Sequence, residues 1–475
     1  MLASFASISV VNYAFSLIMG WLLIPGDFGL LAFAQTLLLI AGLALNSGFS
    51  WSLAAALARH DTSRRAALIR GAMAANALLA LGISGAIVGL FALGPLRAGL
   101  ETATVTALVA LTVPLLSYSS IVRAAAQGVE RFGVMAFNQA VEVIAKAAAG
   151  LLLVEAGFGA AGAVAGFLIG ALVAALCGLW VLRLLDGRLW GAVELPHLRA
   201  AGGMFGALLG LALLLNLDVV AVKLFAGANR AVTGQYQAAT ILANTPYYLV
   251  AAMMPILFTR LTRTAEVAET RATVVEALRL TLLFLLPIEF ALVAAPDLAL
   301  GRLFPHTYVV AAPLLRLLAL GNCAVILTVI LSTTFQAIGR AVIPARALLA
   351  TTTVEALFLR LLVPTWHAAG AATLFCVAAT TTLVALGFVY ARDLGFDAAQ
   401  HSANWLLRYL GVLSVATALG AVARAMGAGV VPAVGGAGLC FASGVVLLRL
   451  LPLPELALRS PAPCGLDPAA VNGDE

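Results

Sequence analysis

Four apolar stretches of this chain contain ionisable side chains, although Asp, Glu, Lys and Arg make up only 10% of the sequence. In the first of them, Glu142 and Lys146 lie four residues apart, a spacing that places both on one face of a helix. An ionisable group in hydrocarbon costs about 2.5–3.5 kcal/mol on insertion scales, so it normally lines a cavity or has a partner. Glu142 and Lys146 therefore either form an internal salt bridge or contribute to a functional cavity.

The other three stretches contain similar mixtures of polar groups. These groups are Asn216, Asp218 and Lys223 in one stretch, Glu289 and Asp297 in the next, and Glu355 and Arg360 in the last. Cations and amides in a cavity can bind a polyanionic substrate, because a polyanion taken out of water needs compensating charge. Carboxylates can instead bind H⁺ or Na⁺ and couple transport to an ion gradient.

We divide the candidate site residues on this basis. The substrate-binding candidates are Lys146, our first choice, with Arg360, Lys223 and Asn216 in apolar stretches and Arg123, Arg59 and Arg260 at helix ends. The ion-coupling candidates are Glu142, Asp218, Glu289 and Glu355. Structural roles compete with these assignments, since charges near an interface extend towards water and polar pairs link neighbouring membrane helices.

Several aromatic residues could stack on sugars in such a cavity. They are Tyr236, Tyr247, Tyr248, Phe33 and Trp51. Ordinary packing or an interfacial aromatic belt explains them equally well. The cysteines and histidines show no metal-ligand spacing, so we expect neither a metal site nor a cofactor.

The composition indicates that these charges lie in membrane helices. Hydrophobic residues make up 63% of the 475 residues and the mean hydropathy is +1.07, whereas soluble domains are roughly 45–50% apolar. No charged residue occurs between Asp27 and Arg59, and about 20 apolar residues suffice for a helix to cross the bilayer core. The alternating ten-residue segments of a membrane barrel are absent. The chain is therefore predicted to be an all-α polytopic membrane protein.

Polar breaks divide the chain into about fourteen predicted transmembrane helices, or twelve if a short pair is miscounted. The ranges are 2–24, 28–57, 69–93, 102–124, 134–155, 158–184, 202–226, 233–259, 278–300, 310–338, 342–364, 368–390, 404–425 and 430–451. Of the 27 Lys and Arg residues, 19 fall at breaks on one side, five on the other and three inside spans. The positive-inside rule then places both termini in the cytoplasm. It also accounts for the net charge of +6 without a nucleic-acid partner.

Short motifs recur at a nearly constant offset, which indicates an internal repeat. QGVER at 127–131 matches QAIGR at 336–340, and AAGA at 160–163 recurs at 368–371. A weaker pair aligns Gly29 with Gly234. The offset maps the first six spans onto the next six in the same orientation, and it places Lys146 opposite Glu355.

The chain resembles the oligosaccharide and polysaccharide flippases (Wzx-type) of the multidrug/oligosaccharidyl-lipid/polysaccharide exporter (MOP) superfamily. The motifs that support this are PGDFGLLAFAQTLL (25–38), NSGF (46–49), QGVERFG (127–133), NLDVVAVKLFAGANRAVTGQYQAAT (216–240) and FQAIGRAVIP (335–344). The resemblance implies two pseudo-symmetric six-helix lobes forming a V, at 1–200 and 201–400, with appended helices at 401–453. A disordered cytoplasmic tail is expected at 454–475.

The resemblance also implies an activity. The expected cargo is a polyprenyl-diphosphate-linked oligosaccharide, flipped across the bacterial inner membrane by alternating access for O-antigen, exopolysaccharide or capsule assembly. The implied partners are membrane lipids, a glycan polymerase and a chain-length regulator. The alternatives are a drug/cation antiporter of the same superfamily and a peptidoglycan-precursor (lipid II) flippase. An enzyme is disfavoured because no polar loop is large enough to hold a catalytic site, and no P-loop motif is present.

Overall fold

The computed structural model describes residues 2–57, 62–184, 194, 202–225, 229–264 and 266–395, with isolated positions beyond them. Residues Met1–Gly395 form one compact unit, and Phe396–Glu475 form a second. The last two predicted spans and the predicted tail fall in the second unit, almost wholly outside the described residues. The expected total of fourteen spans and the expected boundary near residue 200 therefore stay predictions.

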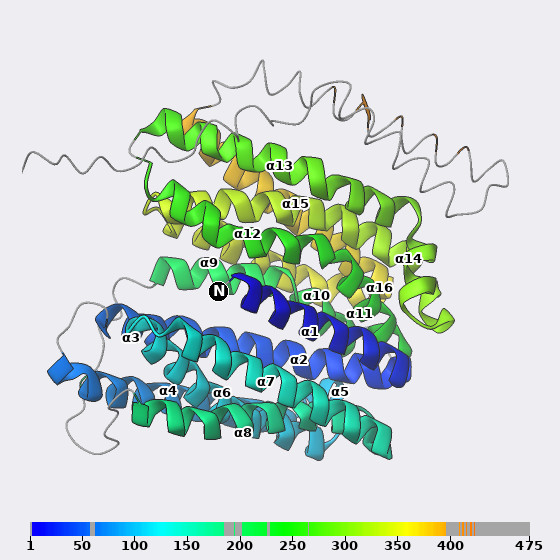
Figure 1. Ribbon diagram of the computed structural model, residues 1–475. Helices are drawn as coiled ribbons and strands as arrows, with labels where there is room; N and C mark the ends of the chain where they lie inside the picture. The colour runs from blue at the N-terminus through cyan, green and yellow to red at the C-terminus, as the bar shows by residue number, and fades with distance from the viewer. Residues whose placement is uncertain are drawn as a thin grey trace, which may run out of the picture. The chain divides into compact units, whose positions relative to one another are not determined.

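The N-terminal half of the first unit contains eight α-helices in the described residues (Figure 1). They are α1 (Leu2–Leu22), α2 (Pro25–Leu45), α3 (Trp51–Leu57), α4 (Thr62–Ala92), α5 (Arg97–Leu100), α6 (Ala103–Gly128), α7 (Phe132–Leu153) and α8 (Gly159–Leu184). Two π-helical turns, η1 (Asn46–Ser50) and η2 (Val154–Phe158), join α2 to α3 and α7 to α8.

The C-terminal half contains the remaining helices of the described chain. They are α9 (Gly202–Leu214), α10 (Leu217–Phe225), α11 (Ala231–Ala243), α12 (Thr245–Leu261), α13 (Val267–Ala294), α14 (Pro296–Leu303), the 3₁₀ helix η3 (His306–Ala311), α15 (Ala312–Ala337) and α16 (Val342–Leu394). The described residues contain no strand, which confirms the all-α fold class.

Seven helical stretches of the described chain are long and apolar enough to cross a membrane, or up to nine if each bent pair is one span. Two of the seven, Phe132–Val181 and Val342–Leu394, contain 50 and 53 residues, and about 20 are enough for one crossing. Each is interrupted by left-handed backbone, at Gly157 (φ 90°) and at His367 (φ 51°). The predicted pairs of spans at 134–184 and 342–390 therefore correspond to helices joined by very short turns.

Backbone geometry repeats at the offset seen in the sequence. Gly159 has φ 52° and ψ −140°, and His367, 208 positions later, has φ 51° and ψ −140°. After α6 the left-handed residue is Glu130 (φ 60°), and after α15 it is Gly339 (φ 78°). Both of these turns place the next residue, an arginine, in a 2.8 Å backbone hydrogen bond to a carbonyl five residues earlier. The two halves thus use the same turns at equivalent places, as a duplicated unit would.

Two membrane spans of the C-terminal half are broken in the middle. The axes of α9 and α10 differ by 43° at Leu215–Asn216, and those of α11 and α12 differ by 44° at Asn244. Broken helices are tolerated at membrane depth where the freed backbone groups are buried in protein, and such breaks often form binding sites. Asp218 lies in the first turn of α10, directly after the first break.

The two halves contact each other along α2 and also at the end of the unit formed by the α1–α2 and α4–α6 connections, which we call the outer end. Helices α2 and α11 approach so closely that a Cβ on Gly234 would lie 1.8 Å from the carbonyl oxygen of Pro25. Trp21 Nε1 donates to the carbonyl oxygen of Leu303 at 2.9 Å. In Figure 1 the outer ends of α1 and α2 lie towards the right, as does α14. These contacts close the outer end of the unit.

Candidate functional site

Lys146 is buried between three helices of the N-terminal half. Its ammonium group donates a hydrogen bond to Asn12 Oδ1 on α1. The same group lies 5.2 Å from the ring centroid of Phe15 on α1 and 4.8 Å from that of Phe167 on α8. Aromatic faces attract cations, most strongly where water is excluded. The lysine is thus stabilised by a neutral amide, by two rings and, without a direct ion pair, by the charge of Glu142.

Glycines bring α8 close enough to α7 to enclose this lysine. A Cβ on Gly170 would lie 2.7 Å from both the Lys146 Cβ and the carbonyl oxygen of Glu142, and one on Gly166 would lie 2.8 Å from the carbonyl oxygen of Lys146. Small residues spaced four apart allow membrane helices to pack with their backbones in near contact. Burial of Lys146 therefore follows from the sequence pattern of α8.

Glu142 pairs with a different cation from the one expected. Its carboxylate lies 2.6 Å from Arg123 Nη1 on α6, so the internal pair with Lys146 is replaced by an ion pair between helices. Both side chains of this pair are less than one-fifth exposed. Arg123, Lys146 and Glu142 together carry a net charge of +1. One cation of this cluster is therefore not neutralised by the carboxylate.

The C-terminal half contains a second polar cluster, which is acidic. Asp218 is buried, accepts a hydrogen bond from Tyr236 Oη at 2.6 Å and accepts another from the backbone N–H of Val219 at 2.8 Å. Glu355 on α16 is also buried, and its charge interacts with that of Asp218. Neither carboxylate forms an ion pair within the part of the chain that the structure describes. Two buried carboxylates without a cation favour binding of a proton or a metal cation.

Lys223 belongs to a third cluster, at the outer end. Its ammonium group lies 2.6 Å from Glu101 Oε1, and Arg230 contacts the other oxygen of the same carboxylate. The Lys223 side chain is 3% exposed, so this pair is largely shielded from water. Glu101 lies between α5 and α6, whereas Lys223 is on α10. In this conformation the lysine therefore bridges the two halves and is not available to a substrate.

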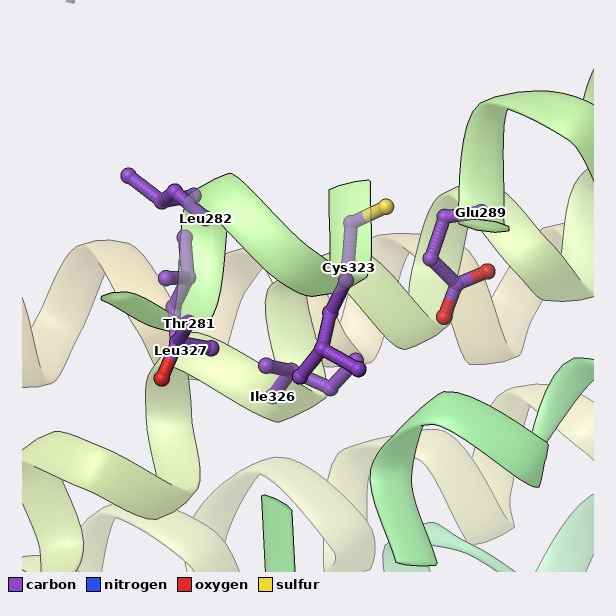
Figure 2. Close-up of a pocket in the computed structure, with 7 residues that line it drawn as sticks. Thr281, Leu282, Glu289, Cys323, Ile326 and Leu327 are labelled. Atoms are coloured by element: carbon purple, nitrogen blue, oxygen red, sulfur yellow. The ribbon is translucent and has the colours of Figure 1, made fainter. Parts of the chain in front are cut away.

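The remaining predicted site residues do not join these clusters. Arg260 pairs with Glu276 at 3.2 Å near the end of α12, and Asn216 donates to the carbonyl oxygen of Ala212 at 2.9 Å. Arg360 lies on an exposed part of α16. Arg59 lies outside the described residues. Glu289 is buried in a separate pocket between α13 and α15 (Figure 2).

The aromatic candidates also lie in different environments and do not form one cluster. Phe33 is fully buried and would touch a Cβ on Gly99, whereas Tyr236 serves as the hydrogen-bond donor to Asp218. Tyr247 and Tyr248 form an edge-to-face pair with centroids 5.4 Å apart, and Tyr248 is half exposed. The side chain of Trp51 is outside the description. The first two thus have packing or positioning roles in this conformation.

Sequence reasoning missed two residues that complete these clusters. Asn12 is the one amide side chain in the first apolar stretch, and its strongly polar amide was the available signal for a partner inside the membrane. Glu101 gave no comparable signal, because a glutamate beside a predicted helix end is ordinary. Only the fold shows that it accepts from both Lys223 and Arg230.

The fold and these buried charge clusters define a class, the polytopic membrane proteins with charged groups buried between their helices. The chain is similar to the lipid II flippase MurJ in an inward closed conformation, with a TM-score of 0.70 and 12% identity over 94% of this chain and 98% of that one. It is similar to an inward-facing multidrug resistance MATE transporter, with a TM-score of 0.62 and 15% identity over 81% and 94%. The eukaryotic MATE transporter AtDTX14 gives a TM-score of 0.58 and 15% identity over 83% and 96%. At these identities the likeness shows the fold.

The sequence itself identifies the family. A family model described as polysaccharide biosynthesis protein matches residues 18–313, which is more than half of the chain. The chain therefore belongs to that family, and family and fold together support a flippase role. A search of curated proteins finds no significant match.

Proposed function

We propose that this protein flips polyprenyl-diphosphate-linked oligosaccharide units across the bacterial inner membrane by alternating access. The cargo supplies material for surface polysaccharide assembly, such as O-antigen, exopolysaccharide or capsule. The family match supports the saccharide chemistry, and the fold supports transport through the bilayer.

The observation that carries the proposal is the environment of Lys146. A buried cation beside a neutral amide can exchange that partner for a diphosphate, whereas a cation already paired with a carboxylate gains less from an anion. Arg123 holds the nearby carboxylate of Glu142, which keeps the net charge of this cluster positive. The N-terminal half therefore offers an anion-binding group near the middle of α7.

The acidic cluster of the C-terminal half is assigned to ion coupling. Asp218 and Glu355 bind H⁺ or Na⁺, and Tyr236 orients Asp218 through its hydrogen bond. A cation bound there neutralises the carboxylates and changes the packing of α10 against α16. Transport then uses an ion gradient, which suits a chain without a P-loop motif.

The orientation and the partners follow from the same proposal. Both termini face the cytoplasm, since most Lys and Arg residues fall on that side of the predicted spans. The partners are the lipid-linked oligosaccharide, surrounding membrane lipids, a glycan polymerase and a chain-length regulator. The last two consume the units after they reach the outer leaflet.

Two alternatives give different outcomes in one assay. A lipid II flippase also moves a diphosphate-linked saccharide, and the similarity to the MurJ fold is compatible with lipid II as the cargo. A drug/cation antiporter would need no cationic group for its cargo. The molecule that the purified protein moves distinguishes each alternative from the proposed function.

The test is a flipping assay in proteoliposomes. Fluorescent polyprenyl diphosphate carrying a short oligosaccharide is placed in one leaflet, and its appearance in the other is measured by quenching. We expect flipping by the wild type, loss in Lys146→Ala and partial retention in Lys146→Arg. Arg302→Ala is the control, because Arg302 is exposed on α14 and is not among the substrate-binding candidates.

Three results would contradict the proposal. Equal flipping by wild type and Lys146→Ala would remove Lys146 from the substrate path. Movement of lipid II but not of other polyprenyl diphosphate saccharides would favour the second reading. Exchange of organic cations for protons without any flipping would favour the antiporter.

A further inference from the structure

Helices α13 and α15 enclose a small pocket that neither the substrate cluster nor the coupling cluster uses. Its lining residues are Thr281, Leu282, Leu285 and Glu289 from α13, and Cys323, Ile326 and Leu327 from α15. Figure 2 shows Glu289 and Cys323 on neighbouring helical segments. The cavity has a volume of about 10 Å³ and is partly open. That is about the space that one water molecule needs.

The carboxyl group in this pocket has no hydrogen-bond partner among the residues that the structure describes. Glu289 is 1% exposed, and neither of its two oxygens has a hydrogen-bond partner. An ionised carboxylate without partners in an apolar setting is costly, and such a group normally becomes neutral instead. An unpartnered buried polar group also calls for an explanation beyond packing. The fold therefore maintains a carboxyl group at a site where ionisation is strongly disfavoured.

We propose that Glu289 is a proton-binding site, in a pocket that is separate from Asp218 and Glu355. A proton is the ligand that the lining favours. Sodium needs several oxygen ligands, whereas the side chains here supply the carboxyl group and one hydroxyl, that of Thr281. Cys323 is the other titratable lining side chain, and the lining contains no cation.

Within the described residues, no charged side chain of the helices packed on α13 lines this pocket to hold the charge of the ionised form. Besides α15, α13 contacts α11, α12 and α14, yet the pocket lining comes from α13 and α15 alone. Pro287, two residues before Glu289, interrupts the hydrogen bonding of α13 at this level. Proton release would place a bare charge between α13 and α15 and weaken their packing. This inference stands apart from the identity of the cargo.

Chemical labelling of the full-length protein tests the proposal directly. Dicyclohexylcarbodiimide reacts with a protonated carboxyl group: the acid adds across one C=N bond, and the O-acylisourea rearranges to a stable N-acylurea without loss of atoms. The protein is labelled in lipid nanodiscs at several pH values. Proteolysis and mass spectrometry then quantify the adduct on the peptide that contains Glu289.

We expect an adduct on Glu289 at neutral pH, a decrease as the pH rises and no protection by sodium. Glu269 is the matched control on the same helix, because it is exposed and should remain unlabelled. Cys323→Ser places a stronger hydrogen-bond donor in the pocket, so labelling should be lost at a lower pH than in the wild type. Glu289→Gln should lose this adduct.

The proposal fails on either of two results. Glu289 without label at neutral pH, in protein that becomes labelled at Glu289 in acid, would show that the group is ionised at neutral pH. Protection of Glu289 by sodium but not by potassium would show a metal-cation site instead. Since the wild type is itself the test sample, a poorly folding variant does not affect the outcome.

Discussion

Glu101→Gln should weaken the closure of the outer end. In the closed conformation Glu101 accepts from Lys223 and Arg230, so one carboxylate links the α5–α6 connection to α10 and to the residue before α11. The substitution keeps the shape and removes the charge. Lys223, with its side chain 3% exposed, is then left as a buried cation without a counter-charge. Opening of the outer end would relieve that cost by hydrating the lysine.

The size of the effect follows from the burial of each partner. Removing one member of a buried ion pair costs about 3–5 kcal/mol, and the slight exposure of Glu101 favours the low end. The contact with Arg230, which is 65% exposed, contributes little in comparison. A cost of about 3 kcal/mol shifts the ratio of closed to open molecules about 100-fold. A closed state preferred by about 100 to 1 would thus become about equally populated with the open one.

The assay is a distance measurement between spin labels across the outer end. Leu93, between α4 and α5, and Val310 on η3 are 83% and 66% exposed, so labels on cysteines there should not disturb the packing. Double electron–electron resonance should give one short distance for the wild type. For Glu101→Gln we expect a second, longer distance with a comparable amplitude.

Two controls separate charge loss from general damage. Glu130→Gln changes another glutamate with positive φ, at the opposite end of α6, and should leave the distance unchanged. Adding Lys223→Met to Glu101→Gln removes the unpaired cation and should restore much of the short distance. A distance distribution in Glu101→Gln that matches the wild type would refute the role of this cluster in closure.

Three further predictions concern coupling, packing and pH. Asp218→Asn should make flipping insensitive to collapse of the proton or sodium gradient, as measured with ionophores in proteoliposomes. Gly234→Ala should prevent the close approach to Pro25 and give the longer distance in the resonance experiment. Hydrogen bonding from Arg392, with the charges of Arg392 and Arg340 nearby, lowers the pKa of Asp393. The small stabilisation from ionised Asp393 is fully present above the pKa of an unfolded Asp. It is lost as the pH falls through the lowered pKa of Asp393 in the folded protein. Asp393→Asn should therefore lower the Tm slightly at neutral pH, with the difference vanishing in acid.

Much of the fold could be predicted because membrane helices are specified by composition. Apolar runs and their polar breaks anticipated the helices of the first unit, including the joined pairs 134–184 and 342–390. The repeat could be recognised in the sequence because QGVER and QAIGR form the same turn after α6 and α15. Local sequence determines such turns, so the local sequence was sufficient to predict them.

The partners of the buried charges could not be predicted in the same way. Glu142 has Lys146 one helical turn away, yet it pairs with Arg123 on α6. A local pair competes with every charge that the fold brings near, and those distances depend on helix packing. Lys223 shows the same limit, because its partner Glu101 lies 122 positions earlier in the chain.

The repeat gives these two halves equivalent positions with opposite chemistry. Lys146 on α7 and Glu355 on α16 are 209 residues apart, the offset of the matching turns, and both are buried. The first lies beside a neutral amide and two rings, and the second lies beside another carboxylate. A duplicated backbone has thus kept its turns while one copy holds a cation and the other an acid. Since α2 and α11 are in near contact between the halves, that contact and the Glu101 cluster are two places through which binding of a cation in the acidic half can reach the basic half. Mutations at either place should therefore change coupling without touching the residues of either cluster.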